Sequence, residues 1–371
     1  MLKLLLCLLM TPGTLFAAGE EKDLSFPGLG YPIQLQFSPS SQGRTCFRTG
    51  YSDDPGKEYD TILLQGLMPD GAISLEVEGK GDGFFSGAVR YERDGFRRFP
   101  NGRFWARYRA PARSARRLRV SVTDLGLKGP ASVIVYGTEL LLSGDLRETA
   151  VPASTAPYVP DPSLFVPSTA PFSLIRRAQW GAAPPKEPYT PVSQFFFTLH
   201  HTQGHYPRSY QDSVTEMQFT QDYHQHAKGW NDIGYHFLID PEGRIFEGRP
   251  IGVQGAHVLH HNPGNIGISI MGNYHPPADD VFTPETRRSF VELGAYIRDA
   301  YSVGISSFYA HRDLGDTDCP GDGLYAQKSS LAAQIFPPQP QPSAPALPPP
   351  GALPPAQSES LRQLLLFLGR N

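Results

Sequence analysis

Residues 195–204 read FFFTLHHTQG, a nearly continuous apolar run that ends in two histidines. A short apolar run of this kind predicts a buried strand of a sheet. The end of that strand carries His200, whose imidazole is a candidate for chemistry. The segments around this strand therefore decide both the fold class and the site to which His200 belongs.

The neighbouring segments alternate between helical and extended patterns. The predicted elements are a helix over 209–228, a hairpin of 235–239 and 244–247, a strand over 266–271, a helix that begins at Thr283 and a final helix over 323–334. Thr283 has the side chain of an N-cap, and Pro284 follows in the first turn. Because strands and helices interleave, residues 171–336 are predicted to form an α/β domain.

Two more residues of this domain have side chains that, like that of His200, can bind a metal ion. His311 also follows an apolar strand-like segment, and Cys319 comes eight residues later. Two imidazoles and a thiolate are suitable ligands for Zn²⁺, and three protein ligands leave a fourth position open for water, as in catalytic zinc sites. The residue types thus favour a hydrolytic metal centre.

Other interpretations of these residues are open at this point. His200 alone could be a hydrogen-bonded core residue, and Cys319 could pair with Cys46 in a disulfide. His311 and Cys319 could also form a nucleophilic pair, which leaves His200 without a role. A zinc peptidase is disfavoured because the HExxH pattern is absent.

Five ordered motifs carry a resemblance to a known family. They are FFFTLHHTQG, GWNDIGYHFLIDPEGRIFEGR, GAH, NPGNIGISIMGNY and AHRDLGDTDCPGDGLY. Over residues 172–336 the chain resembles the peptidoglycan recognition proteins, which belong to the type 2 zinc N-acetylmuramoyl-L-alanine amidases. The resemblance implies a mixed sheet flanked by helices, with Zn²⁺ at the floor of a groove that takes peptidoglycan or muropeptides.

The resemblance also implies roles for single residues. His200, His311 and Cys319 match the metal ligands. Tyr235 matches a tyrosine that faces the metal, and Thr317 matches a position near the substrate carbonyl, so both are expected to be catalytic. The residues that match the substrate-binding groove are His224, Trp230, His257 and Asn262.

The implied reaction is zinc-dependent hydrolysis of the amide between N-acetylmuramic acid and L-alanine of the stem peptide. The alternative is a non-catalytic receptor that binds peptidoglycan in the same groove. Receptor-type members typically lack the cysteine ligand, whereas Cys319 is present here. The pair Pro250-Ile251 departs from the family pattern after EGR, so no preference between peptidoglycan types is carried over.

Residues 24–145 form a different block without such a resemblance. Short apolar runs separated by turn residues predict an all-β, sandwich-like domain. Between Arg90 and Arg119 eleven arginines interleave with aromatic residues. This patch could hold an anionic cell-wall polymer, or it could be the solvated face of β-hairpins.

The remaining segments predict export and extended connections. Residues 1–19 have the pattern of a signal peptide, which indicates a secreted or periplasmic protein. A linker over 146–170 and a tail over 337–371 are rich in proline, and the tail ends in a short apolar segment. No transmembrane anchor is expected. The net charge of −3 argues against a nucleic-acid partner.

Overall fold

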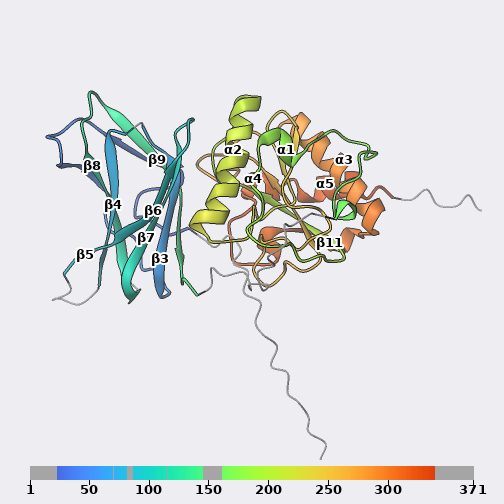
Figure 1. The fold of residues 1–371 in the computed structure, drawn as a ribbon, viewed down its shortest axis with the longest axis horizontal. Coiled ribbons are helices and arrows are strands. Elements are labelled where there is room, and N and C mark those ends of the chain that lie inside the picture. Colours follow the sequence, from blue (N-terminus) through green and yellow to red (C-terminus); the bar gives the residue numbers. More distant parts are fainter. Residues whose placement is uncertain (1–22, 70, 82–86, 115, 145–160, 339–371) are drawn as a thin grey trace, which may run out of the picture. The chain divides into compact units, whose positions relative to one another are not determined.

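The computed structural model describes residues 23–69, 71–81, 87–114, 116–144 and 161–338 (Figure 1). By its internal contacts the chain divides into a unit of residues 1–336 and a unit of residues 337–371. The predicted signal peptide, most of the linker and nearly all of the tail lie outside the described residues. Among the described helices, none has both the length and the apolar character needed to cross a membrane.

The α/β block is built on one mixed sheet, as the resemblance implies. Its strand order is β10-β13-β12-β14-β11-β15, and only β12 and β13 pair antiparallel. The strands are β10 (Leu174–Ile175), β11 (Phe196–His201), β12 (Phe237–Ile239), β13 (Ile245–Glu247), β14 (Asn265–Ile270) and β15 (Phe308–Ala310). The strand that contains His200 is therefore an inner strand, with β14 and β15 parallel on its two sides.

Helices accompany this sheet (Figure 1). They are α1 (Arg177–Trp180), α2 (Tyr210–Asp222), α3 (Pro284–Tyr301), α4 (Asp322–Tyr325) and α5 (Lys328–Ile335). The predicted cap is confirmed, because the Thr283 side chain accepts a hydrogen bond from the backbone N–H of Thr286. The core joins the strands to α3 and α5, whose buried side chains include Leu293 and Ile335.

Two predicted helices differ in detail from the structure. The helix expected over 209–228 ends as α2 at Asp222 and continues as a π-helical turn, η2 (Tyr223–Ala227), in which Lys228 N–H donates to the Tyr223 carbonyl. The expected final helix is split into α4 and α5. Between them Gln327 N–H donates to the Leu324 carbonyl, a shorter-range bond that tightens the backbone.

The β-rich block consists of two antiparallel sheets. One has the order β1-β9-β3-β7-β6 and the other the order β2-β8-β4-β5. The strands are β1 (Ile33–Phe37), β2 (Thr45–Arg48), β3 (Tyr59–Leu67), β4 (Ile73–Lys80), β5 (Val89–Arg90), β6 (Glu92–Arg98), β7 (Arg103–Ser114), β8 (Arg117–Asp124) and β9 (Ala131–Leu141). Among the described residues of this block, no helix interrupts the strands.

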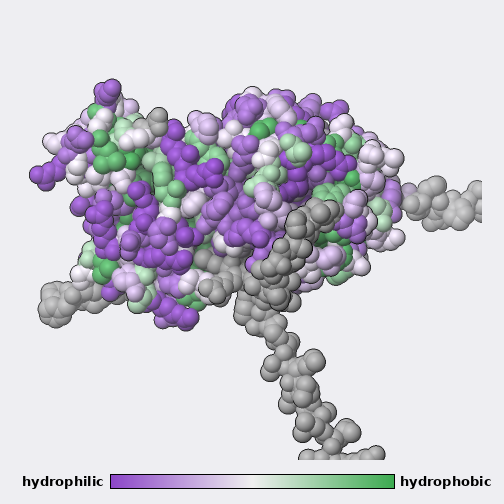
Figure 2. Space-filling view, in the orientation of Figure 1, coloured by the Kyte–Doolittle hydropathy of each residue, from purple (hydrophilic) through white to green (hydrophobic). Residues whose placement is uncertain are grey.

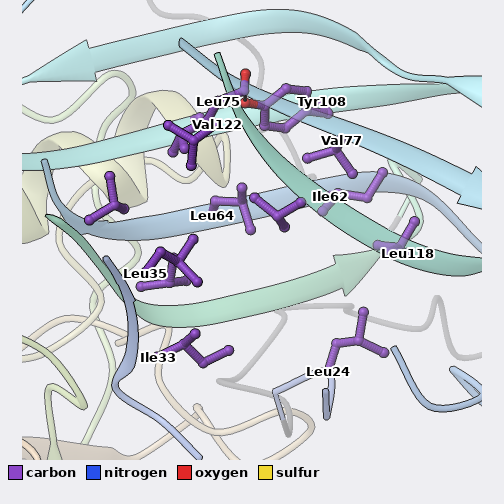
Figure 3. Packing of buried hydrophobic residues seen from close by; sticks show 14 of the residues in the cluster. Leu24, Ile33, Leu35, Ile62, Leu64, Leu75, Val77, Tyr108, Leu118 and Val122 are labelled. Carbon is purple, nitrogen blue, oxygen red and sulfur yellow. Dashed lines mark hydrogen bonds between the residues drawn. The ribbon is translucent and has the colours of Figure 1, made fainter. Parts of the chain in front are cut away.

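The two sheets share one hydrophobic core. Figure 3 shows Ile62 and Leu64 of one sheet and Leu75, Val77 and Val122 of the other in the same cluster. Alternate residues of β1 and β4 are buried, which is the period that a half-buried strand requires. Each such aliphatic side chain stabilises the fold by about 1.5–3 kcal/mol when it is fully buried.

The arginine-rich stretch forms β6, β7 and the start of β8. At least six of its eleven arginines form ion pairs within the chain, with Glu76, Glu78, Asp94, Glu216 and Asp222. Arg103 is buried. The expected patch for an anionic polymer therefore finds no support, because carboxylates of the same chain already neutralise much of its charge.

The β-rich block packs against α2 and η2 of the α/β block. A buried cluster contains Leu63, Phe99 and Trp105 from the first and Phe219 and Tyr223 from the second. Around this cluster the Arg103 guanidinium binds both carboxylate oxygens of Glu216, at 2.8 and 2.9 Å. The two blocks therefore share a buried interface and belong to one unit of the chain.

The outer surface differs from this interface, because hydrophilic residues cover most of the face that Figure 2 shows.

Candidate metal centre and cleft

The sheet brings His200 and His311 together. In the parallel pair β11–β15, Leu199 lies opposite Ala310, so the next residue of each chain, His200 and His311, leaves the sheet at the same edge. The two imidazole centroids are 4.6 Å apart. Two residues separated by 111 positions therefore meet because parallel strands end at a common edge.

Cys319 completes the cluster from the loop after His311. Its Sγ lies 3.6 Å from His200 Nδ1, and the loop is closed by a hydrogen bond from Arg312 N–H to the Cys319 carbonyl. One ligand atom from each of His200, His311 and Cys319 lies within 4.8 Å of the other two, and all three residues are buried. Cys46 and Cys319 are not joined in a disulfide, since Cys46 lies on β2 and its Sγ contacts the Val122 carbonyl.

The protonation of the cluster suits a divalent metal. Burial lowers the pKa of His311 to about 3 and, together with the neighbouring His311 and His257, holds the pKa of His200 well below its usual value. Both imidazoles are neutral near pH 7, so each keeps a lone pair. Within the described chain, the buried Nδ1 of His311 has no hydrogen-bond partner. Two nitrogens and one sulfur form a donor set that Zn²⁺ accepts readily.

His257 orients His200. The Nε2 atom of His257 is 3.0 Å from the Asn265 carbonyl, which can only accept, so this nitrogen carries the proton. Burial lowers the pKa of His257, so the ring is neutral and its Nδ1 accepts. That Nδ1 lies 3.0 Å from His200 Nε2, which must donate. The remaining nitrogen of His200, Nδ1, is then free of a proton on the side of Cys319.

Tyr235 and Thr317, the two expected catalytic residues, lie beside this cluster. The Tyr235 ring packs against His200 with 5.2 Å between centroids. The Thr317 hydroxyl oxygen accepts a hydrogen bond from Cys319 N–H at 3.2 Å, so its own hydrogen can point to a ligand. Tyr235 is buried, whereas Thr317 is partly exposed.

The four expected groove residues, His224, Trp230, His257 and Asn262, are all buried, with at most 2% of each exposed. His224 packs on Trp230 with 4.6 Å between centroids, and its Nδ1 accepts from Gly234 N–H. Asn262 Oδ1 accepts from the N–H groups of His257 and Val258. In this structure these residues lie below the protein surface, and direct contact with a ligand stays a prediction.

An open cleft of about 550 Å³ leads to His311. One side consists of Leu259, His260, His261, Leu314, Gly315, Asp316 and Thr317. The other side comes from the β-rich block and consists of Asp23, Leu24, Ser25, Asp53, Asp54, Pro55, Lys57 and Leu140. The sequence carries no local signal for this second side, because segments at least 171 residues from His311 form it.

Known proteins match the α/β block of this chain. Residues 190–322 match the family model described as N-acetylmuramoyl-L-alanine amidase. The chain is 33% identical over 158 residues to peptidoglycan-recognition protein SC2 of Drosophila melanogaster. The alignment covers 41% of this chain and 83% of the Drosophila protein. The chain is 35% identical over 159 residues to N-acetylmuramoyl-L-alanine amidase of Homo sapiens, covering 40% of this chain and 26% of the human protein.

Solved structures include relatives of the same kind. Drosophila PGRP-LB is 31% identical, with 43% of this chain and 93% of that chain covered and a TM-score of 0.39. Peptidoglycan recognition protein LE, solved in complex with tracheal cytotoxin, a monomeric diaminopimelic acid-type peptidoglycan, is 26% identical, with 42% and 92% covered and a TM-score of 0.38. The β-rich block lies outside the residues that match the family model.

Proposed function

Because the chain belongs to the family of peptidoglycan recognition proteins and type 2 amidases, we propose that it is a zinc-dependent N-acetylmuramoyl-L-alanine amidase. The bond cut is the amide between the lactyl carbonyl of N-acetylmuramic acid and the nitrogen of L-alanine. The observation that supports this activity is the meeting of His200, His311 and Cys319 at one end of an open cleft.

The residues around the cluster fit hydrolysis of an amide. A bound Zn²⁺ supplies Lewis acidity, which polarises a carbonyl and makes water a better nucleophile at neutral pH. The Thr317 hydroxyl, fixed by the Cys319 amide, donates toward the carbonyl oxygen of the scissile bond. Tyr235, packed on His200, supplies a second donor for the charge that develops on that oxygen. The hydroxyl of a water molecule adds to the carbonyl carbon, the C–N bond breaks, and the other proton of that water goes to the leaving nitrogen, which gives a carboxylic acid and a free amine.

The protein scaffold contributes orientation. The hydrogen bond from His200 to His257 and the one from His257 to the Asn265 carbonyl fix the ring of His200 before any ligand binds. Such outer partners commonly hold a metal-binding histidine in one tautomer. The proposed site is thus preorganised by its own backbone.

Digestion of purified peptidoglycan tests the proposal. The wild-type chain with Zn²⁺ should release free stem peptides with an L-alanine amino terminus, detected by mass spectrometry. A chelator or Cys319→Ala should abolish the release. Cys46→Ala is the matched control, because Cys46 lies on β2 of the other block and should leave the release unchanged.

The alternative function is a receptor that binds peptidoglycan without cutting it. Under that alternative, muropeptides bind to the wild-type chain and leave intact, with or without Zn²⁺. Full stem-peptide release by Cys319→Ala would contradict the metal mechanism. Export through residues 1–19 is part of the same proposal, and amino-terminal sequencing of the mature protein tests it.

A further inference from the structure

The cleft at His311 has a second wall that the α/β block does not provide. Segments 23–25 and 53–57 of the β-rich block line it opposite Gly315 and Thr317. We propose that this wall is part of the substrate site, and that its carboxylates select peptidoglycan stems with a free side-chain ammonium group. The inference rests on the proposed function, since it places a stem peptide in this cleft.

The wall is held in place by buried contacts. Arg103 and Glu216 pair across the interface with at most 1% of either side chain exposed. Lys228 Nζ donates to Glu139 Oε2 at 2.7 Å, and Trp105 Nε1–H donates to Asp222 Oδ1 at 2.7 Å. Separation of the blocks would leave buried charges without partners, which is strongly unfavourable. The wall therefore has a fixed position beside the metal centre.

The two wall segments are tied to each other and to the end of β11. Asp53 N–H donates to the Ser25 carbonyl, and Leu24 N–H donates to the Thr138 carbonyl. Asp23 Oδ2 accepts from Gln203 Nε2 at 2.5 Å, and Gln203 lies three residues after His200. Two of these bonds join backbone atoms and the third joins two side chains, so the carboxylates of the wall stand in a defined relation to the cluster.

The charge of the wall indicates the ligand chemistry. Asp23, Asp53 and Asp54 outnumber Lys57 on this side, and Asp316 adds a carboxylate on the opposite side. A second observation points to a ligand here: His311 lines the same cleft, is buried, and its Nδ1 has no partner within the described chain. A metal at that floor and acidic groups at the rim suit a ligand with a carbonyl at one end and a cation at the other.

A peptidoglycan stem fits this description. The amide next to the muramic acid would lie at the floor, and the side-chain amine of the diamino acid further along the peptide would reach the rim. That amine is an ammonium ion in an un-cross-linked stem and becomes a neutral amide in a cross-linked one. The wall thus distinguishes the two states by charge.

The test measures binding of two muropeptides in the presence of a chelator, so that hydrolysis is blocked. One has a free side-chain amine and the other carries an N-acetyl group there. The wild-type chain should bind the free amine about three- to tenfold more tightly, since exposed ion pairs contribute modestly each. Salt at about 0.5 M should reduce this preference, because Asp53 and Asp54 are exposed.

The decisive variant is Asp53→Asn/Asp54→Asn. An asparagine at 54 still accepts the hydrogen bond from Gly56 N–H, so the turn is retained while the charge is lost. This variant should bind both muropeptides equally. The control Glu292→Gln/Asp299→Asn removes two charges from α3 and should keep the wild-type preference.

Equal binding of the two muropeptides by the wild-type chain, or an unchanged preference in the wall variant, would overturn the inference. Hydrolysis is measured separately. If the chain shows the charge preference but never releases stem peptide, the amidase proposal fails, while the inference that the wall selects the free ammonium group still holds.

Discussion

His200 Nε2 and His257 Nδ1 lie 3.0 Å apart in the buried floor of the site, and the bond between them sets which nitrogen of His200 faces Cys319. The direction of this bond follows from the Asn265 carbonyl, which forces the proton of His257 onto Nε2. A backbone atom of β14 thereby controls the side chain of β11. This relation makes His257 a positioning residue for the metal centre.

We predict that His257→Ala lowers the affinity for Zn²⁺ about 10- to 100-fold, as loss of an outer partner typically does. Without His257 the His200 ring loses the acceptor that fixes its tautomer. Titration against a coloured chelator measures the change directly. His226→Ala, at an exposed histidine outside the cluster, should leave the affinity unchanged; equal affinity in both variants would remove the positioning role.

A second route to the same effect leaves every histidine in place. A Cβ added to Gly267 on β14 would lie 2.7 Å from Cγ and Cδ2 of His257, closer than real contacts allow. Gly267→Ala should therefore displace His257 and weaken Zn²⁺ binding in the same titration. Gly304→Ala is the control, because a Cβ there meets nothing within 4 Å. Wild-type affinity in Gly267→Ala would show that the ring position does not matter.

Removal of the metal should destabilise the fold. A ligand at 100 times its Kd adds about 2.7 kcal/mol to the free energy of unfolding when it binds only the folded state. Thermal unfolding of the wild-type chain should shift to a lower Tm when a chelator is added. Cys319→Ala should show a much smaller shift, and an equal shift in both proteins would mean that the metal binds elsewhere.

Loss of a hydrogen-bond donor at the site should lower kcat much more than it lowers the affinity for Zn²⁺. Tyr235→Phe removes one hydroxyl next to His200 and should lower kcat about 100-fold, the usual cost of one donor to a developing oxyanion. Its Zn²⁺ affinity should stay near that of the wild type. Tyr325→Phe, which removes an exposed hydroxyl bonded to Asp313, is the matched control. A wild-type kcat in Tyr235→Phe would exclude the hydroxyl from the reaction.

Loss of one partner of the buried ion pair between the blocks should destabilise the fold strongly, whereas replacement of both partners by apolar residues should change its stability little. Arg103→Ala or Glu216→Ala leaves one buried charge alone and should lower the free energy of unfolding by about 3–5 kcal/mol. Arg103→Met/Glu216→Leu removes both charges and should be close to neutral. Denaturant unfolding measures all three variants. A double variant as unstable as the single ones would show that the guanidinium contacts to Gln65 and Gly66 matter more than the pair.

The sequence by itself determined the elements whose signals are local. The apolar run before His200, the capping pair at Thr283 and Pro284, and the hairpin around Asp240 each predict a structure that depends on neighbouring residues, and each is present. His200 and His311 also follow from the sequence, because each stands at the end of an apolar segment, whereas Cys319 is a candidate through its residue type and its spacing of eight residues from His311. The π-helical turn after Asp222 and the break between α4 and α5 have no such signal, since single backbone bonds cause them.

Only the tertiary structure decided what lies next to what. The arginines of β6 and β7 look like an exposed binding patch, yet Arg103 is buried against Glu216, 113 residues away. The resemblance implies a groove position for His257, and the structure adds that His257 orients His200 through its bond to the Asn265 carbonyl of β14. The wall at Asp53 comes from a block with no resemblance to the family. Contacts of this kind depend on the docking of separate sheets and helices, and docking leaves no periodic pattern in the chain.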